Sequence, residues 1–497
     1  MTARRAPVVL LLLAASAWGA VRAGAADAPP APGERLVGLR ECVQAAATRH
    51  PALRRARLAR DQAALDVERA RAGFYPVLSF QLGYGDTRWP GEAGEPPEQS
   101  QGLLSYDAGV LVDTPLGTQL RAALTNRRLG TSDPGAALDP EHRAGLELGL
   151  TQPLLRGLGL GPNLSGWNQA RLQLRAAAAE LRGALNALAL EAEQAYWTLS
   201  LAQQEVEIAA RSLARARQQL EDTQENIRRG LLPDADLYVV EESQVRFQTR
   251  LLQAQNRLAA ARSRLGEVMR LEPEAARGLR ASEAPEPGAV RLPSEYELLA
   301  AGFQDCPALL VARARAEAAG VALAYAEDRR LPRLDLEASF RLNGLTGSLG
   351  ATWEELWGFG RTDAFLGLSL EVPLFDALDG SGVERADLEV ARALLGMQEA
   401  EQRLRFEVHD LRRDIGHRLE VQRLARRVSE LARLKLEAQQ DKYAAGISAL
   451  KDVVQFLREL DQAELEEAEA LVELAASAAA LRAVVGDLHL AHGIEVR

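Results

Sequence analysis

Two stretches of this sequence are far longer than an ordinary helix and contain no proline. Residues 165–229 and 378–445 are rich in alanine, leucine, arginine and glutamate, with apolar residues three and four positions apart. This periodicity is typical of helices that pack along other helices. At 1.5 Å per residue, the first stretch would be roughly 100 Å long. One compact domain cannot bury the apolar face of such a helix, so it must pack along neighbouring helices or other subunits.

The long stretches belong to a unit that occurs twice. "HPAL" (50–53) and "CPAL" (306–309) each open a segment that reaches a second proline at the same interval, at Pro76 and Pro332. Further blocks match in the same order. The full set of pairs is 50–84 with 306–340, 146–155 with 366–375, and 228–240 with 444–456. These matches predict a duplicated chain, with a first repeat of 27–285 and a second of 286–497.

Each repeat is predicted to run from a helix through strands into the long helix, then through a break into a last helix. Prolines and glycines set the predicted ends of these elements. The expected helices are 39–75, 165–229 and 234–271 in the first repeat, and 296–330, 378–445 and 449–486 in the second. The expected strands lie within 77–151 in the first repeat and at 334–342 and 365–372 in the second.

The strand segments alternate apolar with polar residues. In 77–84, Leu78, Phe80 and Leu82 alternate with Ser79 and Gln81. Barrel strands with lipid outside and water inside show this pattern, and so do the strands of a soluble two-faced sheet.

Four strands cannot close a water-filled barrel alone, so the membrane alternative requires a cyclic oligomer, and three chains would give twelve strands. Residues 106–130 predict a further hairpin, either within the barrel wall or outside it.

The N-terminus predicts export. Residues 1–26 combine Arg4 and Arg5 with an apolar run and small residues before a cleavage site, which is the pattern of a signal peptide. No later apolar run is long enough for a membrane-spanning helix. The net charge of −10 and the lack of a basic block argue against a nucleic-acid partner.

The side chains that carry chemistry form no recognisable set. The two cysteines, Cys42 and Cys306, lie in no metal-binding pattern. We expect buried free thiols, with a single disulfide as the alternative. The six histidines are scattered, and no nucleophile accompanies a general base. We therefore predict no enzyme activity, no cofactor and no metal site.

The chain resembles the TolC-type outer-membrane efflux protein family, also called outer-membrane factors. The resemblance lies in the duplicated blocks, in the strand ends "TQPLLRG" and "EVPLFD" that lead into long helices, and in the "YxxG" turn at 443–446. It implies a mainly α fold with a small transmembrane β part. It also implies a homotrimer, whose α-helical barrel continues an outer-membrane β-barrel and forms a tunnel across the periplasm of a Gram-negative-type cell.

The resemblance also implies a function and partners. Such a protein is a passive exit duct of a tripartite efflux or type I secretion system. It sits in outer-membrane lipid and docks on a periplasmic adaptor (membrane fusion) protein that is served by an inner-membrane pump.

The resemblance further implies a pore constriction at the helix turns. Asp236 and Asp452 match acidic residues that line this entrance, Tyr443 matches a residue that ties the helices shut, and Gly230 and Gly446 mark the turn tips. Threefold symmetry would make a ring of each aspartate, and carboxylate rings attract cations. An aspartate in the first turn of a helix also complements the helix dipole, so both roles remain open.

The chain departs from the family pattern at Ser448 and Gln455, where some members carry an arginine and a second acidic residue. The entrance is therefore expected to carry fewer charges and a different latch. An alternative function is a soluble periplasmic coiled-coil adaptor, which would explain the export signal and the helices but not the amphipathic strands. A hydrolase with helical decoration is the third alternative.

Overall fold

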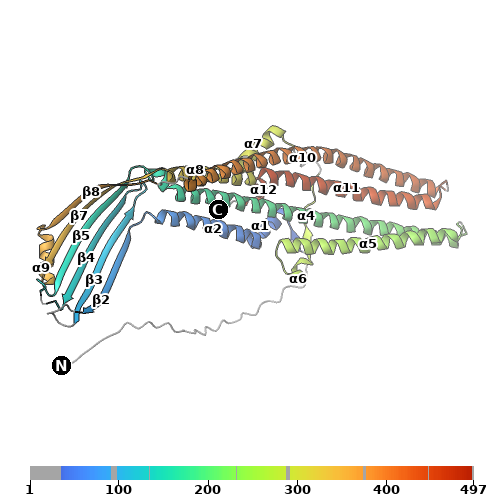
Figure 1. Ribbon diagram of the computed structural model, residues 1–497. Coiled ribbons are helices and arrows are strands. Elements are labelled where there is room, and N and C mark those ends of the chain that lie inside the picture. Colours follow the sequence, from blue (N-terminus) through green and yellow to red (C-terminus); the bar gives the residue numbers. More distant parts are fainter. Residues whose placement is uncertain are drawn as a thin grey trace, which may run out of the picture.

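The protein is elongated, with a β-sheet at one end and long helices that run away from it (Figure 1). In this computed structural model, the described residues are 35–90, 98–133, 135–230, 232–286, 292–372, 377–445 and 447–494. The predicted signal peptide 1–26 and the predicted tip residue Gly446 lie outside them. The sheet meets the helical part where the chain passes from strands into the long helices.

The sheet has six antiparallel strands in the order β2-β3-β4-β5-β7-β8. The hairpin predicted at 106–130 lies within it, between the strands β2 and β5. The sheet of one chain therefore has six strands. The expected twelve strands of a trimer were counted from four strands in each chain. The strands are β2 (Val77–Pro90), β3 (Glu98–Asp113), β4 (Gln119–Thr131), β5 (Glu141–Pro153), β7 (Arg333–Thr346) and β8 (Thr362–Glu371).

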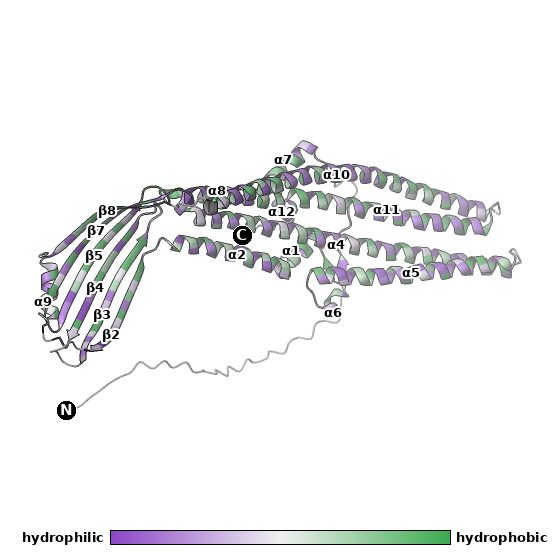
Figure 2. Ribbon diagram, viewed as in Figure 1, coloured by the Kyte–Doolittle hydropathy of each residue, from purple (hydrophilic) through white to green (hydrophobic). Residues whose placement is uncertain are grey.

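The two faces of the sheet differ in polarity. Side chains alternate between the faces along each strand, and the register places apolar residues of neighbouring strands side by side on one face and polar residues on the other. Hydropathy changes residue by residue along the strands (Figure 2). One row of paired residues on the apolar face runs Leu78, Val110, Ala122, Leu148, Phe340 and Ala364, and one on the polar face runs Gln81, Asp107, Thr125, Gly145 and Asn343. One face therefore suits hydrocarbon and the other suits water.

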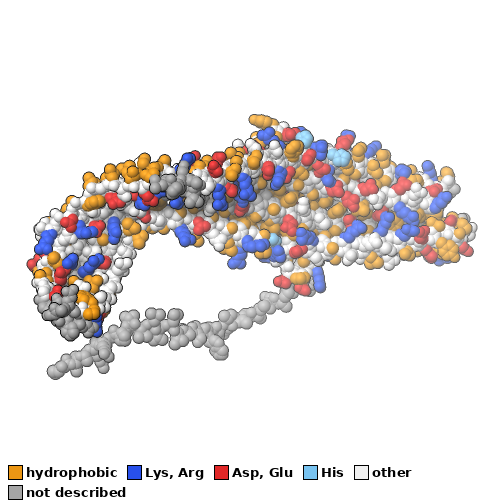
Figure 3. Space-filling model, viewed as in Figure 1, with side chains coloured by type: hydrophobic (Ala, Val, Ile, Leu, Met, Phe, Trp, Pro, Cys, Tyr) orange, Lys and Arg blue, Asp and Glu red, His pale blue; other side chains and the backbone are white. Residues whose placement is uncertain are grey.

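Four long helices form two hairpins. Helix α4 (Ser165–Arg228) pairs with α5 (Ala235–Val268), and α10 (Ala377–Ala444) pairs with α11 (Leu450–Val485), while α11 also packs along α4. Side chains of both charges are interspersed over these helices, with hydrophobic side chains among them (Figure 3). The bounds lie close to the expected 165–229, 234–271, 378–445 and 449–486.

The shorter helices correct two predicted elements. The expected helix 39–75 is split into α1 (Leu39–Arg49) and α2 (Pro51–Ala72), and the expected helix 296–330 is split into α7 (Glu295–Asp305) and α8 (Pro307–Arg329). His50 and Cys306 stand at the breaks with extended backbone. Each precedes a proline, and the proline ring disfavours the helical conformation of the residue before it.

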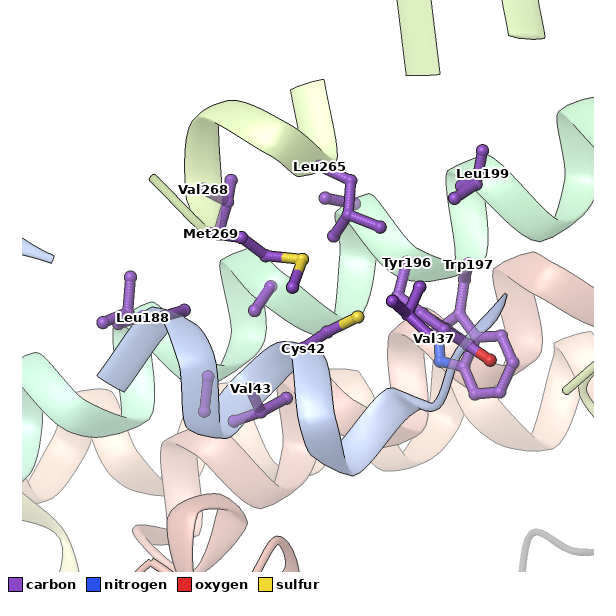
Figure 4. Close-up of a cluster of buried hydrophobic side chains, with 14 of the residues drawn as sticks. Val37, Cys42, Val43, Leu188, Tyr196, Trp197, Leu199, Leu265, Val268 and Met269 are labelled. Carbon is purple, nitrogen blue, oxygen red and sulfur yellow. The ribbon is translucent and has the colours of Figure 1, made fainter. Parts of the chain in front are cut away.

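A buried belt holds the helices together about halfway along the molecule. Cys42 and Val43 of α1 pack against Tyr196 of α4 and against Leu265 and Met269 at the end of α5 (Figure 4). Beside this belt, β1 (Arg35–Val37) pairs in parallel with β6 (Leu279–Ala281), after the short helix α6 (Pro273–Ala276). The belt ties the first described strand to the hairpin α4–α5.

The C-terminal turn is fastened to the belt by a buried amide. Asn186 of α4 donates to the carbonyl of Gly486 at 3.0 Å and accepts from the backbone N–H of His489 at 3.1 Å. His489 lies in α12 (Leu488–Ala491), and burial lowers the pKa of its imidazole. Cys42 and Cys306 are both free and buried, as predicted from their spacing.

Candidate gate at the free ends of the helical hairpins

The two hairpins end together at the end of the molecule furthest from the sheet (Figure 1). In the first hairpin, α4 ends at Arg228 and Gly230 follows with a φ of +71°. A Cβ at Gly230 would meet no atom within 4 Å, so the backbone conformation and not crowding favours glycine there. The second hairpin turns between Ala444 and Leu450, and Gly446 lies outside the described residues.

Asp236 and Asp452 both lie in the first turn of a returning helix. Asp234 is the N-cap residue of α5 and Ala449 is that of α11, so neither predicted aspartate is itself the cap. In the first turn, a carboxylate is close to the positive end of the helix dipole. Both aspartates are partly exposed, and they therefore retain access to solvent at the tip.

Tyr443 lies between the hairpins. It belongs to the last turn of α10, and its ring packs against a cluster that includes Phe247 of α5 and Leu213 of α4. Burial raises the pKa of the Tyr443 hydroxyl, and the charges of Asp236 and Asp222 raise it further. The structure thus places Tyr443 close enough to Asp236 of α5 and to Asp222, near the end of α4, for their charges to act on its hydroxyl.

The residues that depart from the family pattern have local partners. The side-chain amide of Gln439 donates to the hydroxyl of Ser448, which donates in turn to the carboxylate of Asp452 at 3.5 Å. Gln455 donates to Glu459 at 3.0 Å, one turn further along α11. Ser448 therefore contacts residues of its own hairpin, whereas Gln455 lies on an exposed part of α11.

A layer of buried ionic contacts lies further into the hairpins. Asp461 of α11 accepts from the hydroxyl of Ser212 of α4 at 2.7 Å and pairs with Arg250 of α5. Its side chain is only 10% exposed. A carboxylate in such a place is costly unless it is paired and hydrogen-bonded. Asp461 therefore links the two hairpins through specific partners.

Glu464 completes this layer one turn further on. Its carboxylate contacts Arg211 of α4 at 3.3 Å and Arg433 of α10 at 3.1 Å. We call Asp461, Glu464 and their partners the ionic layer. Sequence reasoning missed it, because the charges read as a solvated helix face. The available signal was that Asp461 and Glu464 continue the three- and four-residue spacing of Leu457 and Leu460.

None of the helices in the part of the chain that the structure describes combines the length and the apolar character that crossing a membrane requires. No group of three or more histidine, cysteine, aspartate or glutamate side chains in the described ranges is placed to hold a metal ion.

Comparison with known proteins relates this chain to outer-membrane efflux proteins. Residues 303–487 match the family of outer membrane efflux proteins. No curated protein matches the chain in sequence. The solved structures it resembles include the outer-membrane channel OprN, with a TM-score of 0.64 and 18% identity over 90% of this chain and 89% of that one.

Two further structures have the same fold. VceC of Vibrio cholerae matches with a TM-score of 0.62 and 16% identity over 90% of this chain and 96% of that one. The MtrE channel of Neisseria gonorrhoeae, in its open state, matches with a TM-score of 0.62 and 17% identity over 90% of this chain and 88% of that one. The family match and the shared fold confirm the resemblance to TolC-type outer-membrane efflux proteins. They also confirm the location in the outer membrane with a periplasmic extension.

The ionic layer yields a prediction about the contact between the hairpins. Asp461→Asn keeps the shape of the side chain and removes its charge, so Ser212 and Arg250 lose a charged acceptor. We expect the hairpin contact to weaken by about 1–3 kcal/mol. The measurement is hydrogen exchange of the backbone amides of residues 453–464, which should become faster.

The matched control is Asp410→Asn on α10, where the aspartate is exposed and paired only with Arg413 in its own helix. Exposed pairs of this kind contribute about 0–1 kcal/mol, so exchange should hardly change. Equal exchange in both variants would mean that the ionic layer does not hold the hairpins together.

Proposed function

We propose that this protein is a passive exit duct of an efflux or type I secretion system, formed by three copies of the chain. The observation that carries the proposal is a sheet with one apolar face and two unpaired edges, joined to helical hairpins that end in acidic turns. Each copy would contribute part of a β-barrel and part of a helical tunnel. Cargo would enter at the hairpin tips and leave through the barrel.

The edges of the sheet support ring closure. Strand β2 pairs only with β3, and β8 pairs only with β7, among the described strands. Every described residue of β2 is exposed. Unpaired strand edges are unfavourable within a membrane, and β2 of one copy can pair antiparallel with β8 of the next. Three copies of six strands make eighteen, and barrels of that size enclose an aqueous channel.

Two of the long helices also carry apolar side chains that the chain itself leaves exposed. On α5, Tyr238, Val245 and Leu252 follow one another at heptad spacing and are 71%, 60% and 62% exposed. On α10, Val428 and Leu431 form a second exposed apolar stripe, with exposed fractions of 51% and 44%. Among the described elements, α5 packs chiefly along α4, and α10 packs chiefly along α11 and α8. We infer that α5 of one copy packs against α10 of the next, as in a coiled coil.

The partners follow from the same arrangement. A duct without an energy source of its own requires an inner-membrane pump and a periplasmic adaptor protein to deliver cargo to the hairpin tips. The alternative function, a soluble periplasmic adaptor, leaves the apolar face of the sheet exposed to water. Large exposed apolar patches are rare on soluble proteins, and the duct is therefore the better reading of the sheet.

A substitution in the proposed seam tests this function. Leu431→Arg places a charge in the apolar stripe of α10 and should prevent or weaken trimer formation. The control is Glu437→Arg, an exposed position on the same helix, which lies about 120° around the helix axis from Leu431 at 100° per residue. Detergent-solubilised protein would be compared by sedimentation and by electrophoresis without boiling.

We expect trimers from the outer-membrane fraction for the native protein and for Glu437→Arg, and smaller species for Leu431→Arg. Native protein recovered as a monomer, or recovered in the soluble periplasmic fraction, would contradict the proposed duct. Trimers of unchanged stability for Leu431→Arg would place the subunit contact elsewhere.

The acidic entrance is tested by charge removal. Asp236→Asn together with Asp452→Asn would remove two proposed rings of three carboxylates from the narrow end of the tunnel. Because such rings attract cations and repel anions, we expect the cation-to-anion permeability ratio to fall several-fold. The measurement is the reversal potential of single channels in a planar bilayer under a salt gradient.

The control removes the same charge elsewhere. Asp387→Asn together with Asp410→Asn changes two exposed aspartates of α10 that are remote from the tip, and it should leave the reversal potential unchanged. If both double variants behave alike, Asp236 and Asp452 serve only the helix dipoles.

A further inference from the structure

The short helix α9 (Leu349–Trp357) lies between β7 and β8, at the end of the sheet furthest from the long helices (Figure 1). It covers β5 and β7 on their apolar face. Leu356 is fully buried against Ala144 and Leu342, which both belong to that face. A Cβ at Gly344 would collide with the carbonyl of Thr352. The backbone of α9 therefore rests directly on the outer wall of the proposed barrel.

Specific polar contacts fasten α9 to the end of the sheet. Strand β8 pairs with β7 only as far as Leu342. Beyond that point, the carboxylate of Glu355 accepts from the backbone N–H of Leu345 at 2.8 Å and pairs with Arg361 at 3.0 Å. Glu355 thus takes the place of the next strand as the acceptor for β7. A helix held in this way has a fixed orientation on the sheet.

The exposed side of α9 carries Trp357 together with Leu349 and Glu354. Trp357 is 56% exposed, and Phe359, just beyond the helix, is 60% exposed. Phe359 has a φ of +55°, a left-handed conformation that costs a residue with a Cβ about 1–2 kcal/mol. The chain thus holds a bulky apolar ring in a strained backbone position and leaves that ring uncovered.

These rings lie where the apolar band of the sheet ends. At the level of Leu342, the paired row on this face is apolar from β2 to β7, where it runs Phe80, Ala108, Leu124, Leu146 and Leu342, and it ends in Thr362 on β8. Four residues further outward along these strands, the row on the same face contains Arg128 and His142. Since α9 spans both levels, its aromatic side chains lie at the transition from apolar to charged surface. Tryptophan and other aromatic residues concentrate at this depth of a bilayer.

We propose that α9 is an anchor for the lipid surface, seated at the boundary between headgroups and acyl chains of the outer leaflet, with Trp357 and Phe359 as its lipid contacts. This inference rests on the proposed barrel. The lipid is the occupant because the surface is continuous with the apolar wall. Neighbouring chains would meet through β2 and β8, whereas α9 lies over β5 and β7.

Spin labels on single introduced cysteines test the anchor in the full-length trimer. Cys42 and Cys306 are buried, and burial, with the nearby charge of Glu41, raises the pKa of the Cys42 thiol to about 12. An exposed new thiol is therefore labelled selectively. The anchor probes are Trp357→Cys and, independently, Phe359→Cys. Leu148→Cys on the apolar face and Ser339→Cys on the polar face are the references.

The labelled trimers are reconstituted into vesicles of phosphatidylethanolamine and phosphatidylglycerol. The spectra are then recorded with oxygen, which concentrates in lipid, and with a water-soluble nickel chelate. We expect the Trp357 and Phe359 labels to be reached by oxygen, and to collide with the chelate several-fold less often than the Ser339 label. They should be shallower than the Leu148 label.

Three results would overturn the anchor. If the labels on α9 collide with the chelate as often as the Ser339 label does, while the Leu148 label remains in lipid, then α9 faces water and the proposed barrel is retained. If both reagents fail to reach them, a neighbouring subunit covers α9. If Leu148 is also open to the chelate, the proposed barrel itself is wrong, and the anchor fails with it.

Discussion

Among the described residues, a single chain leaves two strand edges without hydrogen-bond partners and several apolar surfaces uncovered. The sheet has one face of apolar side chains and two strand edges with free N–H and C=O groups, and hydrocarbon offers no partner for such groups. The long helices carry exposed apolar stripes on α5 and α10. A single chain would leave all of these surfaces in water, and the proposed duct would cover them with lipid and with further copies of the chain.

Much of the helical architecture could be predicted from the sequence, because its signals are local. The absence of proline and the regular apolar spacing marked α4 and α10, and the turn residues marked the hairpin tips. The split of 39–75 into α1 and α2 was missed although Pro51 was visible, because the repeat suggested one continuous helix. The six-stranded sheet required the register of β3 and β4, which depends on pairing across the sheet and not on any local pattern.

The candidate site was only partly predictable for the same reason. Only the positions of Asp236, Asp452 and Tyr443 beside the turns follow from the sequence, and their role in a gate is what the family resemblance implies. The approach of Asp222 to Tyr443 depends on how two hairpins pack. Asp461 was missed because its partners, Ser212 and Arg250, come from two other helices. Helix α9 was missed because nine residues are too few for a clear period, and its support comes from Gly344 and Glu355.

The ionic layer also bears on how the hairpins could separate. An apolar layer that opens into a water-filled tunnel exposes hydrocarbon, at about 25 cal/mol per Å². When paired charged groups separate, water hydrates them again, and this hydration offsets much of the electrostatic attraction that is lost. Asp461 lies roughly 16 Å along the helix axis from the start of α11 at Leu450, at 1.5 Å per residue. A charged link at that depth, between the buried belt and the tips, would let the tips part while the belt stays packed.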